Sequence, residues 1–157
     1  MVNSIRRHLL KWHRACSLSI QKGGCKPVKT NFTILIADRN PNVRTFLQRE
    51  MTAAGYRTLL AESAREVLKL AFQGEPLDMI ILDPDLPDAA ETHMLKHLMD
   101  RIPVLPVVMH TYPSEHGNDS KDMSGVIFVE KRGSSVERLK QVVHENQIDS
   151  YSRRQKI

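Results

Sequence analysis

The chain has 157 residues, of which 41% are hydrophobic and 26% are charged. This length suits one globular domain with flanking segments and is too short for two full domains. No apolar run approaches the ~20 residues of a membrane-spanning helix. The first thirty residues also lack the continuous apolar stretch and small-residue cleavage site of a secretory signal. We therefore expect a single domain in the cytoplasm.

The net charge of +5 comes from the two ends of the chain. Residues 1–30 and 151–157 hold ten of the 23 Lys and Arg, whereas all 18 Asp and Glu lie between positions 38 and 149. The body therefore carries 13 cations against 18 anions. The two cysteines, Cys16 and Cys25, form no close pair, so the sequence indicates neither a zinc site nor a disulfide framework. We divide the chain into a basic N-terminal extension (1–30), a domain (31–146) and a basic C-terminal tail (147–157).

The extension contains one patterned segment, Ser4–Ile20. Most of its basic residues lie away from one apolar stripe of the helix. The residues near this stripe are Ile5, Leu9, Trp12, Cys16 and Ile20. A basic amphipathic helix of this kind lies on an anionic membrane or on a partner protein. The segment can equally be disordered, or an upstream stretch included by the choice of start codon, and we favour these outcomes. No helix-turn-helix or aromatic-interleaved basic surface follows, so nucleic acid binding has no support.

From residue 31 onward, short apolar runs alternate with segments of helical period. The runs predict five strands: Thr33–Ala37, Arg57–Leu60, Met79–Leu82, Val107–His110 and Val126–Val129. The second of these is placed mainly by its neighbours. Continuous apolar runs separated by helices are typical of a mostly parallel sheet that is covered on both faces. The sequence therefore predicts a doubly wound α/β fold with right-handed crossovers.

The helical segments between the strands carry their own start and stop signals. The first follows Asn40, a capping residue, and Pro41, and it stops at Gly55. The second runs from Ser63 to Phe72, with Ser63 as cap and Glu66 as its capping-box partner. Further helices are predicted over Ala89–Met99 and Ser135–Glu145, and the polar crossover Tyr112–Gly125 is expected to be short, mobile and only weakly helical.

Polar side chains follow the predicted strands at their carboxyl ends, where ligands bind in open α/β sheets. They are Asp38 and Arg39, then Asp83 and Asp85, then Thr111, and finally Glu130 and Lys131. An aspartate can attack a phosphoryl group when a nearby lysine, usually with a divalent cation, relieves the repulsion between the two anions. A hydroxyl can then donate to a phosphoryl oxygen. This set of residues is therefore suited to phosphoryl transfer.

Four motifs occur in a familiar order along the chain: ILIADRNPNVR (34–44), DMIILDPDLPD (78–88), VVMHT (107–111) and FVEK (128–131). Together they resemble the receiver domain of two-component response regulators. The resemblance covers residues 31–146 and leaves both tails unexplained. It implies a flavodoxin-like sheet of five parallel strands in the order 2-1-3-4-5, within a three-layer α/β/α sandwich.

The resemblance also implies roles for single residues. Asp83 would be the phosphoacceptor, Lys131 would pair with the phosphoryl group, and Thr111 and Phe128 would be the switch residues. Mg²⁺ would be held by Asp38, Asp83 and the backbone carbonyl of Asp85. The partners would be a sensor histidine kinase or phosphotransfer protein and a separate effector. The resemblance is also compatible with a homodimer. The domain would be a signalling module rather than an enzyme.

Three positions depart from the family pattern. Glu91 replaces a common loop glycine and Arg132 replaces the proline after the lysine, but Arg39 matters most because the family has an acidic metal ligand there. A guanidinium cannot ligate Mg²⁺, and its fork can bridge Asp83 and Asp85 in the space the ion would fill. We therefore expect weakened metal binding and slow or absent phosphorylation.

Plainer interpretations remain open for these residues. Asp83-Pro84 can be an ordinary strand-ending turn, and Asp38 can serve only as a capping acid. Each remaining side chain also has a structural alternative: Thr111 as a backbone partner, Lys131 with Arg132 as a solvated pair, Phe128 as packing, and His93 with His97 as a solvated helix face rather than a metal site.

Two functions follow as hypotheses. The first is a stand-alone receiver that accepts a phosphoryl group on Asp83 and changes its Thr111/Phe128 face to alter a contact with a separate effector. The second is a pseudo-receiver that binds a partner constitutively, with Arg39 holding the pocket in one state. A metabolic enzyme on the same fold is a distant third, because no nucleophile-base pair or glycine-rich phosphate loop is visible.

Overall fold

A computed structural model describes residues 31–112 and 125–154, without the side chains of the last four. The predicted segment Ser4–Ile20 and nearly all of the crossover Tyr112–Gly125 lie outside these residues, so the predictions made for them remain predictions. Within the described ranges, no helix is both long enough and apolar enough to cross a bilayer.

Five parallel strands form one sheet in the order β2-β1-β3-β4-β5, as predicted. Their bounds are Thr33–Ala37 (β1), Arg57–Ala61 (β2), Met79–Leu82 (β3), Val107–Thr111 (β4) and Val126–Glu130 (β5). Three of the strands extend one residue beyond the predicted ends, and the other two match. Every residue of β1, β3 and β4 is buried, which is why these strands appear in the sequence as continuous apolar runs.

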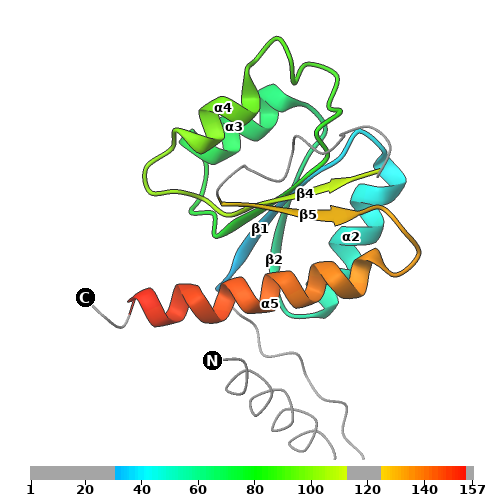
Figure 1. Ribbon diagram of the computed structural model, residues 1–157, viewed down its shortest axis with the longest axis vertical. Helices are drawn as coiled ribbons and strands as arrows, with labels where there is room; N and C mark the ends of the chain where they lie inside the picture. The colour runs from blue at the N-terminus through cyan, green and yellow to red at the C-terminus, as the bar shows by residue number, and fades with distance from the viewer. Residues whose placement is uncertain (1–30, 113–124, 155–157) are drawn as a thin grey trace, which may run out of the picture.

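The register of the sheet brings the strand ends into line. Ala37, the last residue of β1, pairs with Ala61 on one side and with Leu82 on the other. Thr111, the last residue of β4, pairs with Glu130, the last residue of β5. The residues that follow these strands therefore meet at a single carboxyl edge, toward which the arrowheads of β4 and β5 point in Figure 1.

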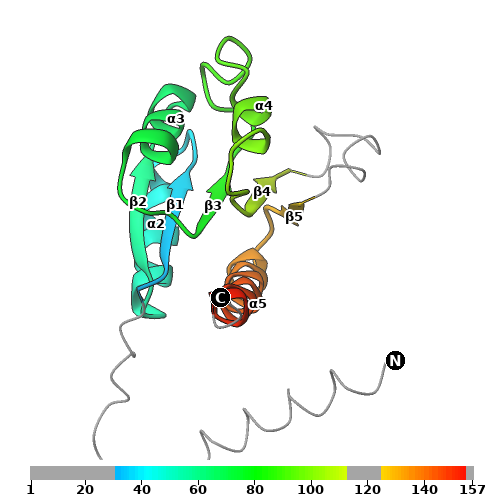
Figure 2. The same cartoon turned by 90° about the vertical axis from the view of Figure 1, so that its left-hand side faces the viewer.

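Four described helices cover the two faces of the sheet (Figure 2). On one face, α2 (Pro41–Ala53) and α5 (Ser135–Arg154) enclose a core that includes Leu47, Met51, Leu139 and Val143. On the other face, α3 (Ala64–Gln73) and α4 (Met94–Met99) enclose a second core. This is the predicted three-layer α/β/α arrangement.

The helix starts follow the predicted capping signals. The side chain of Asn40 accepts a hydrogen bond from Asn42 N at 2.9 Å, with Pro41 at the first helical position of α2. Ser63 accepts from Glu66 N at 3.2 Å at the start of α3. The Glu66 carboxylate reaches back one residue further than predicted, to Glu62 N at 2.9 Å. Both helices are therefore fixed at the ends nearest the carboxyl edge.

The third predicted helix, Ala89–Met99, is wrong in its first half. Only Met94–Met99 forms α4, and turns precede it. The hydroxyl of Thr92 donates to the carbonyl of Asp88 at 2.8 Å, and His93 has a left-handed backbone with φ 46°. The residues predicted to form the start of the helix form these non-helical turns instead. His93 and His97 are exposed, as expected for a solvated pair.

The last predicted helix, Ser135–Glu145, is too short. The helix α5 continues to Arg154, through most of the segment we assigned to the tail. Asn146 donates to the carbonyl of Val142 at 2.9 Å, and Gln147 is buried beside the hydroxyl of Tyr56. With no glycine or proline after Glu145, the sequence gives the helix no reason to stop there.

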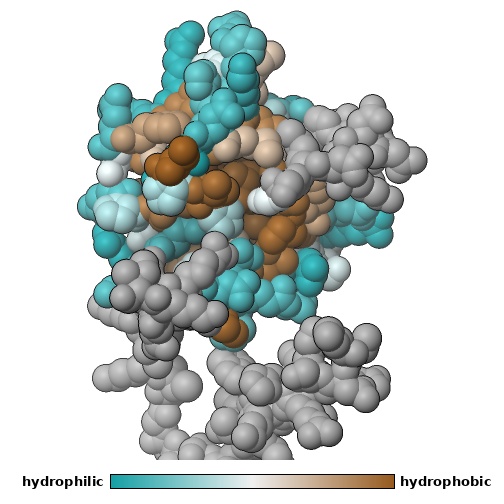
Figure 3. All heavy atoms as spheres, turned by 60° about the vertical axis from the view of Figure 1, so that its left-hand side comes forward, coloured by the Kyte–Doolittle hydropathy of each residue, from teal (hydrophilic) through white to brown (hydrophobic). Residues whose placement is uncertain are grey.

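The amino edge of the sheet has a different character from the carboxyl edge. Apolar side chains gather on the side of the molecule shown in Figure 3. Ile102 and Val104, which precede β4 at this edge, are among the most exposed large hydrophobic residues described. Two large apolar side chains are therefore open to solvent in the loop that precedes β4.

Candidate functional site

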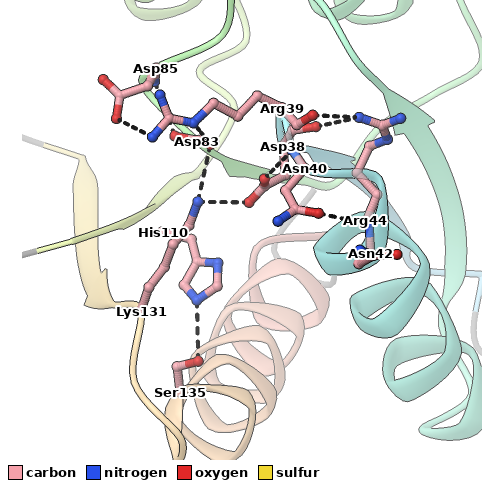
Figure 4. A network of polar contacts seen from close by, with 10 residues as sticks. All are labelled: Asp38, Arg39, Asn40, Asn42, Arg44, Asp83, Asp85, His110, Lys131 and Ser135. Carbon is pink, nitrogen blue, oxygen red and sulfur yellow. Dashed lines mark hydrogen bonds and ion pairs between the residues drawn. The ribbon is translucent and has the colours of Figure 1, made fainter.

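Two buried aspartates share one lysine at the carboxyl edge (Figure 4). Lys131 Nζ lies 2.8 Å from Asp38 Oδ2 and 3.0 Å from Asp83 Oδ2. The side chains of these three residues are only 8%, 3% and 1% exposed. The residues come from three strand ends that are far apart in the sequence, so the predicted convergence of Asp38, Asp83 and Lys131 is present in the structure.

Backbone hydrogen bonds hold these side chains in place. Asp38 Oδ1 accepts from Asn40 N at 2.8 Å, and Asp83 Oδ1 accepts from Asp85 N at 3.0 Å. The amide of Asp83 donates to the carbonyl of Ala37 at 2.7 Å. Each carboxylate thus uses one oxygen to fix its own loop and turns the other toward Lys131. This arrangement combines the capping role considered for Asp38 with a place in the pocket.

The three charges stabilise one another. Burial alone would lower the pKa of Lys131, but the carboxylates of Asp38 and Asp83 outweigh it and raise that pKa. Burial would likewise raise the pKa of Asp83, but the amide of Asp85 and the cations Lys131 and Arg39 hold it below its ordinary value. Asp83 is therefore ionised at neutral pH, which is the state a nucleophile needs.

Arg39 lies where the sequence predicts, across Asp83 and Asp85. Its Nε is 3.8 Å from Asp83 Oδ2, and its Nη2 is 3.6 Å from Asp85 Oδ2. The Arg39 side chain is 48% exposed, whereas that of Asp83 is 1% exposed. The guanidinium is therefore on the solvent side of the buried carboxylate and covers it.

The residues present do not fit a divalent cation. Mg²⁺ needs oxygen ligands at about 2.0–2.1 Å in near-octahedral order, but Asp83 Oδ2 is already shared by two cations. Asp38 gives one oxygen to Asn40 N and the other to Lys131. Within the described ranges, no three His, Cys, Asp or Glu side chains are grouped so as to hold a metal ion. The metal roles of Asp38, Asp83 and Asp85 thus remain predictions that the donor arrangement does not favour.

Thr111 ends β4 at the same edge of the sheet, opposite Glu130 of β5. It is 6% exposed, and its Oγ1 meets no hydrogen-bond partner among the described residues. Its backbone carbonyl accepts from Lys131 N at 2.8 Å, so β4 and the lysine are tied together. A buried hydroxyl without a partner is costly in a fold and is expected where a ligand supplies the partner.

Phe128 has a packing role in this structure. It pairs with Met109 across β4 and β5 and lies partly buried against the core under α3 and α4. The structural alternative for this residue is therefore seen directly. Its proposed part in switching remains a prediction.

Two residues of the site were not predicted. His110 is buried on the face of β4 opposite to Thr111, with Nε2 3.2 Å from Ser135 Oγ at the start of α5. Burial, together with the neighbouring charge of Lys131, lowers the pKa of His110 to about 4. Arg44 donates to the carbonyl of Asp38 at 2.6 Å. Alternation along β4 fixes the face on which His110 lies. Its position near Lys131 follows from the register of β4 and β5, which the sequence does not show.

Asp88 was also missed. Its carboxylate accepts from Ala64 N at 2.6 Å and from Arg65 N at 3.1 Å, so it caps α3 from the loop that follows β3. Burial would raise the pKa of Asp88, but these amide bonds hold it below its ordinary value. The loop that carries Asp83 is thereby joined to the start of α3. The contact spans more than twenty positions, so no local pattern in the sequence predicts it.

The strand order and the pocket identify the protein as a flavodoxin-like α/β domain with a cluster of aspartates and a lysine at the switch point of its sheet. The family then follows from comparison. The model of the response regulator receiver domain matches residues 34–144. The chain therefore belongs to the response regulator receiver domain family, whose members are signalling modules of two-component systems.

Single proteins that are similar to this chain include a transcriptional regulator and a response regulator. The DNA-binding transcriptional regulator NtrC of Bradyrhizobium sp. is 32% identical over 77 residues, which cover 49% of this chain and 16% of that protein. The chain thus matches only about a sixth of this relative. The response regulator TrrA in complex with the histidine kinase ThkA is 26% identical, with a TM-score of 0.63, over 73% of this chain and 97% of that one.

TrrA of Thermotoga maritima in complex with Mg²⁺-BeF is 25% identical, with a TM-score of 0.64, over 73% of this chain and 98% of that one.

Proposed function

We propose that this receiver domain accepts a phosphoryl group on Asp83 from a phosphohistidine donor and passes the signal to a separate effector. The observation that carries the proposal is the ion pair of an ionised Asp83 with Lys131 at 3.0 Å, at the strand edge where Thr111 also ends β4 with a buried hydroxyl that lacks a described partner. These are the nucleophile, the charge-balancing cation and the oxyanion donor that phosphoryl transfer needs.

In the proposed transfer, a carboxylate oxygen of Asp83 attacks phosphorus and forms a new P–O bond. The P–N bond of the donor breaks, and its electron pair returns to the imidazole, which then takes a proton from water. Lys131 remains beside the carboxylate and balances part of the added charge. Thr111 Oγ1 donates to a phosphoryl oxygen. The new ligand thus supplies the partner that Thr111 otherwise lacks.

The comparisons support the choice of partner. TrrA, a receiver similar to this chain, forms a complex with the histidine kinase ThkA. We therefore expect the donor to be a sensor histidine kinase or a phosphotransfer protein. The effector and a homodimer stay predictions.

A second candidate is favoured by the position of Arg39. Asp83 is 1% exposed under a guanidinium, so a donor reaches it only after Arg39 moves. A pocket that stays closed would make the domain a constitutive protein-binding module in which the carboxyl edge has one state. The two candidates differ in whether Asp83 can be modified at all.

Phosphorylation by small donors separates them. The protein is incubated with phosphoramidate or acetyl phosphate, with and without MgCl₂, and its intact mass is measured. We expect a mass increase equal to one HPO₃ group. Hydroxylamine should remove this group, as it removes an acyl phosphate, and the Asp83→Asn variant should not acquire it. Asp100→Asn, an exposed aspartate after α4, is the matched control and should still be labelled. An unmodified wild-type protein under every condition would contradict the proposal and favour the constitutive module.

A further inference from the structure

The charge balance of the pocket depends on a cation that belongs to the chain itself. Asp38, Asp83 and Asp85 supply three carboxylates, and Lys131 and Arg39 supply two cations. Lys131 is placed between Asp38 and Asp83, whereas Arg39 is placed between Asp83 and Asp85. Each pair of neighbouring carboxylates therefore has its own cation, as the close-up in Figure 4 shows.

The position of Arg39 is set by its sequence neighbours. Asp38 is fixed by Asn40 N at 2.8 Å, and the Asp38 carbonyl accepts from Arg44 Nη1 at 2.6 Å. Arg44 also contacts Glu62 at 3.3 Å, on the loop after β2. The backbone on both sides of Arg39 is thus held, and its side chain lies across Asp83 and Asp85.

A divalent ion and this guanidinium need the same carboxylate oxygens. An ion at the edge of Asp83 would have to displace Arg39 from Asp83 Oδ2 and from Asp85 Oδ2. It would otherwise lie within a few ångströms of two positive groups, in a place where burial weakens screening by water. Arg39 brings its charge without any loss of metal hydration, and its planar fork suits two carboxylates.

We infer that Arg39 is the resident cation of this pocket and that it excludes Mg²⁺, so that no divalent metal ion occupies the pocket of the unmodified protein. The inference goes beyond the proposed function, because it concerns the pocket before any phosphoryl donor is present. It holds for the phosphorylated receiver and for the constitutive module alike. Failure of phosphorylation would therefore leave it untouched.

Metal titration of the full chain tests the inference. Amide NMR spectra and thermal unfolding midpoints are recorded against MgCl₂, with NaCl at matched ionic strength, and Mn²⁺ serves as a paramagnetic probe. For the wild-type protein we expect no shift localised at Asp83 and no selective broadening by Mn²⁺ at millimolar concentrations. The unfolding midpoint should follow ionic strength alone.

The decisive variant is Arg39→Asp, which removes the guanidinium and adds a carboxylate at an exposed loop position. In the absence of metal it should unfold at a lower temperature than the wild type, because like charges then meet at the edge. Millimolar MgCl₂ should restore its midpoint, and Mn²⁺ should broaden the amides around Asp83. Addition of Asp83→Asn to this variant should remove both effects.

Arg39→Gln serves as the second variant, because it removes the charge and keeps the length. We expect its affinity for Mg²⁺ to lie between those of the wild type and Arg39→Asp. If the wild type binds Mg²⁺ at Asp83 with millimolar affinity, the inference is wrong. It is equally wrong if neither variant gains affinity, because the exclusion would then have another cause.

Discussion

Two lysine-carboxylate pairs in this protein have the same length and very different surroundings. Lys131 Nζ is 2.8 Å from Asp38 Oδ2 at the carboxyl edge, and Lys140 Nζ is 2.8 Å from Glu50 Oε2 where α5 passes α2. The side chains of the first pair are 8% and 3% exposed, and those of the second are 35% and 24% exposed. The distance alone cannot distinguish a structural charge cluster from an ordinary surface pair.

The difference lies in what happens when one partner is lost. Without Lys140, water reaches Glu50 and solvates it, so little is lost. Without Lys131, Asp38 and Asp83 would share a buried space with no ammonium between them, and neither could be solvated without opening the edge. The pocket therefore depends on its lysine for stability as well as for chemistry, whereas the α2–α5 pair is dispensable.

The strongest test of this comparison is Lys131→Met against Lys140→Met. We expect Lys131→Met to lower the free energy of unfolding by about 3–5 kcal/mol, because it strands two buried carboxylates. Lys140→Met should have a much smaller effect. Urea denaturation at neutral pH measures both, and the pKa of Asp83 should rise in the first variant as its hydrogen-bonded cation disappears.

The same two variants also show how the comparison could fail. Equal loss of stability in both would mean that water enters the carboxyl edge as freely as it reaches α5. At a pH low enough to protonate the carboxylates, the two variants should lose more similar amounts of unfolding free energy, because a neutral carboxyl group no longer needs the lysine.

A second test uses the histidine beneath the lysine. The pKa of His110 is about 4 in the folded protein and about 6.5 in an ordinary histidine. Between these values the unfolded chain binds more protons, so stability is complete above about pH 6.5 and is lost as the pH falls toward 4. The loss from this group amounts to roughly 3 kcal/mol at most. The lowered pKa of Asp83 acts in the same direction, but only at lower pH.

Measurement of the unfolding midpoint against pH isolates the contribution of His110. His110→Gln should flatten the dependence in the upper part of this window, whatever its effect at neutral pH. His97→Gln, on the exposed side of α4, is the control and should keep the wild-type slope. An unchanged slope in His110→Gln would show that protons reach this histidine without opening the edge, and the pocket would then be wetter than its burial indicates.

The strand and helix bounds show which parts of the fold can be predicted from the sequence. The strands were predicted because β1, β3 and β4 are buried on both faces and so consist almost entirely of apolar residues. The starts of α2 and α3 follow from Asn40 and Ser63, whose capping bonds are local. The errors are at helix ends, where turns around Thr92 leave α4 five residues shorter than predicted and Gln147 of the longer α5 contacts Tyr56.

The pocket divides in the same way. Asp38, Asp83, Thr111 and Lys131 were predictable because each follows or ends a strand, and parallel strands bring such positions to one edge. The bridge from Arg39 to Asp83 and Asp85 was predictable from charge and position. His110 and the cap of α3 by Asp88 were not, because both depend on contacts between distant segments that leave no periodic pattern.

The smallest expected effect concerns Thr111, and it distinguishes a group kept for function from one kept for stability. A buried hydroxyl without a partner costs free energy, and a methyl group of the same shape does not. We therefore expect Thr111→Val to be neutral or to raise the free energy of unfolding by up to about 1 kcal/mol. Urea denaturation measures the change, and Thr58→Val, whose hydroxyl lies 3.3 Å from that of Thr52, is the control.

A loss of more than about 1 kcal/mol in Thr111→Val would mean that the hydroxyl has a structural partner, which would return it to the backbone role considered from the sequence. A neutral or stabilised variant would instead identify the Thr111 hydroxyl as a group whose cost the fold tolerates. Within the pocket, the charges of Lys131 and the aspartates are balanced by one another, whereas the hydroxyl of Thr111 is balanced by nothing among the described residues. That imbalance is what the proposed phosphoryl group would remove.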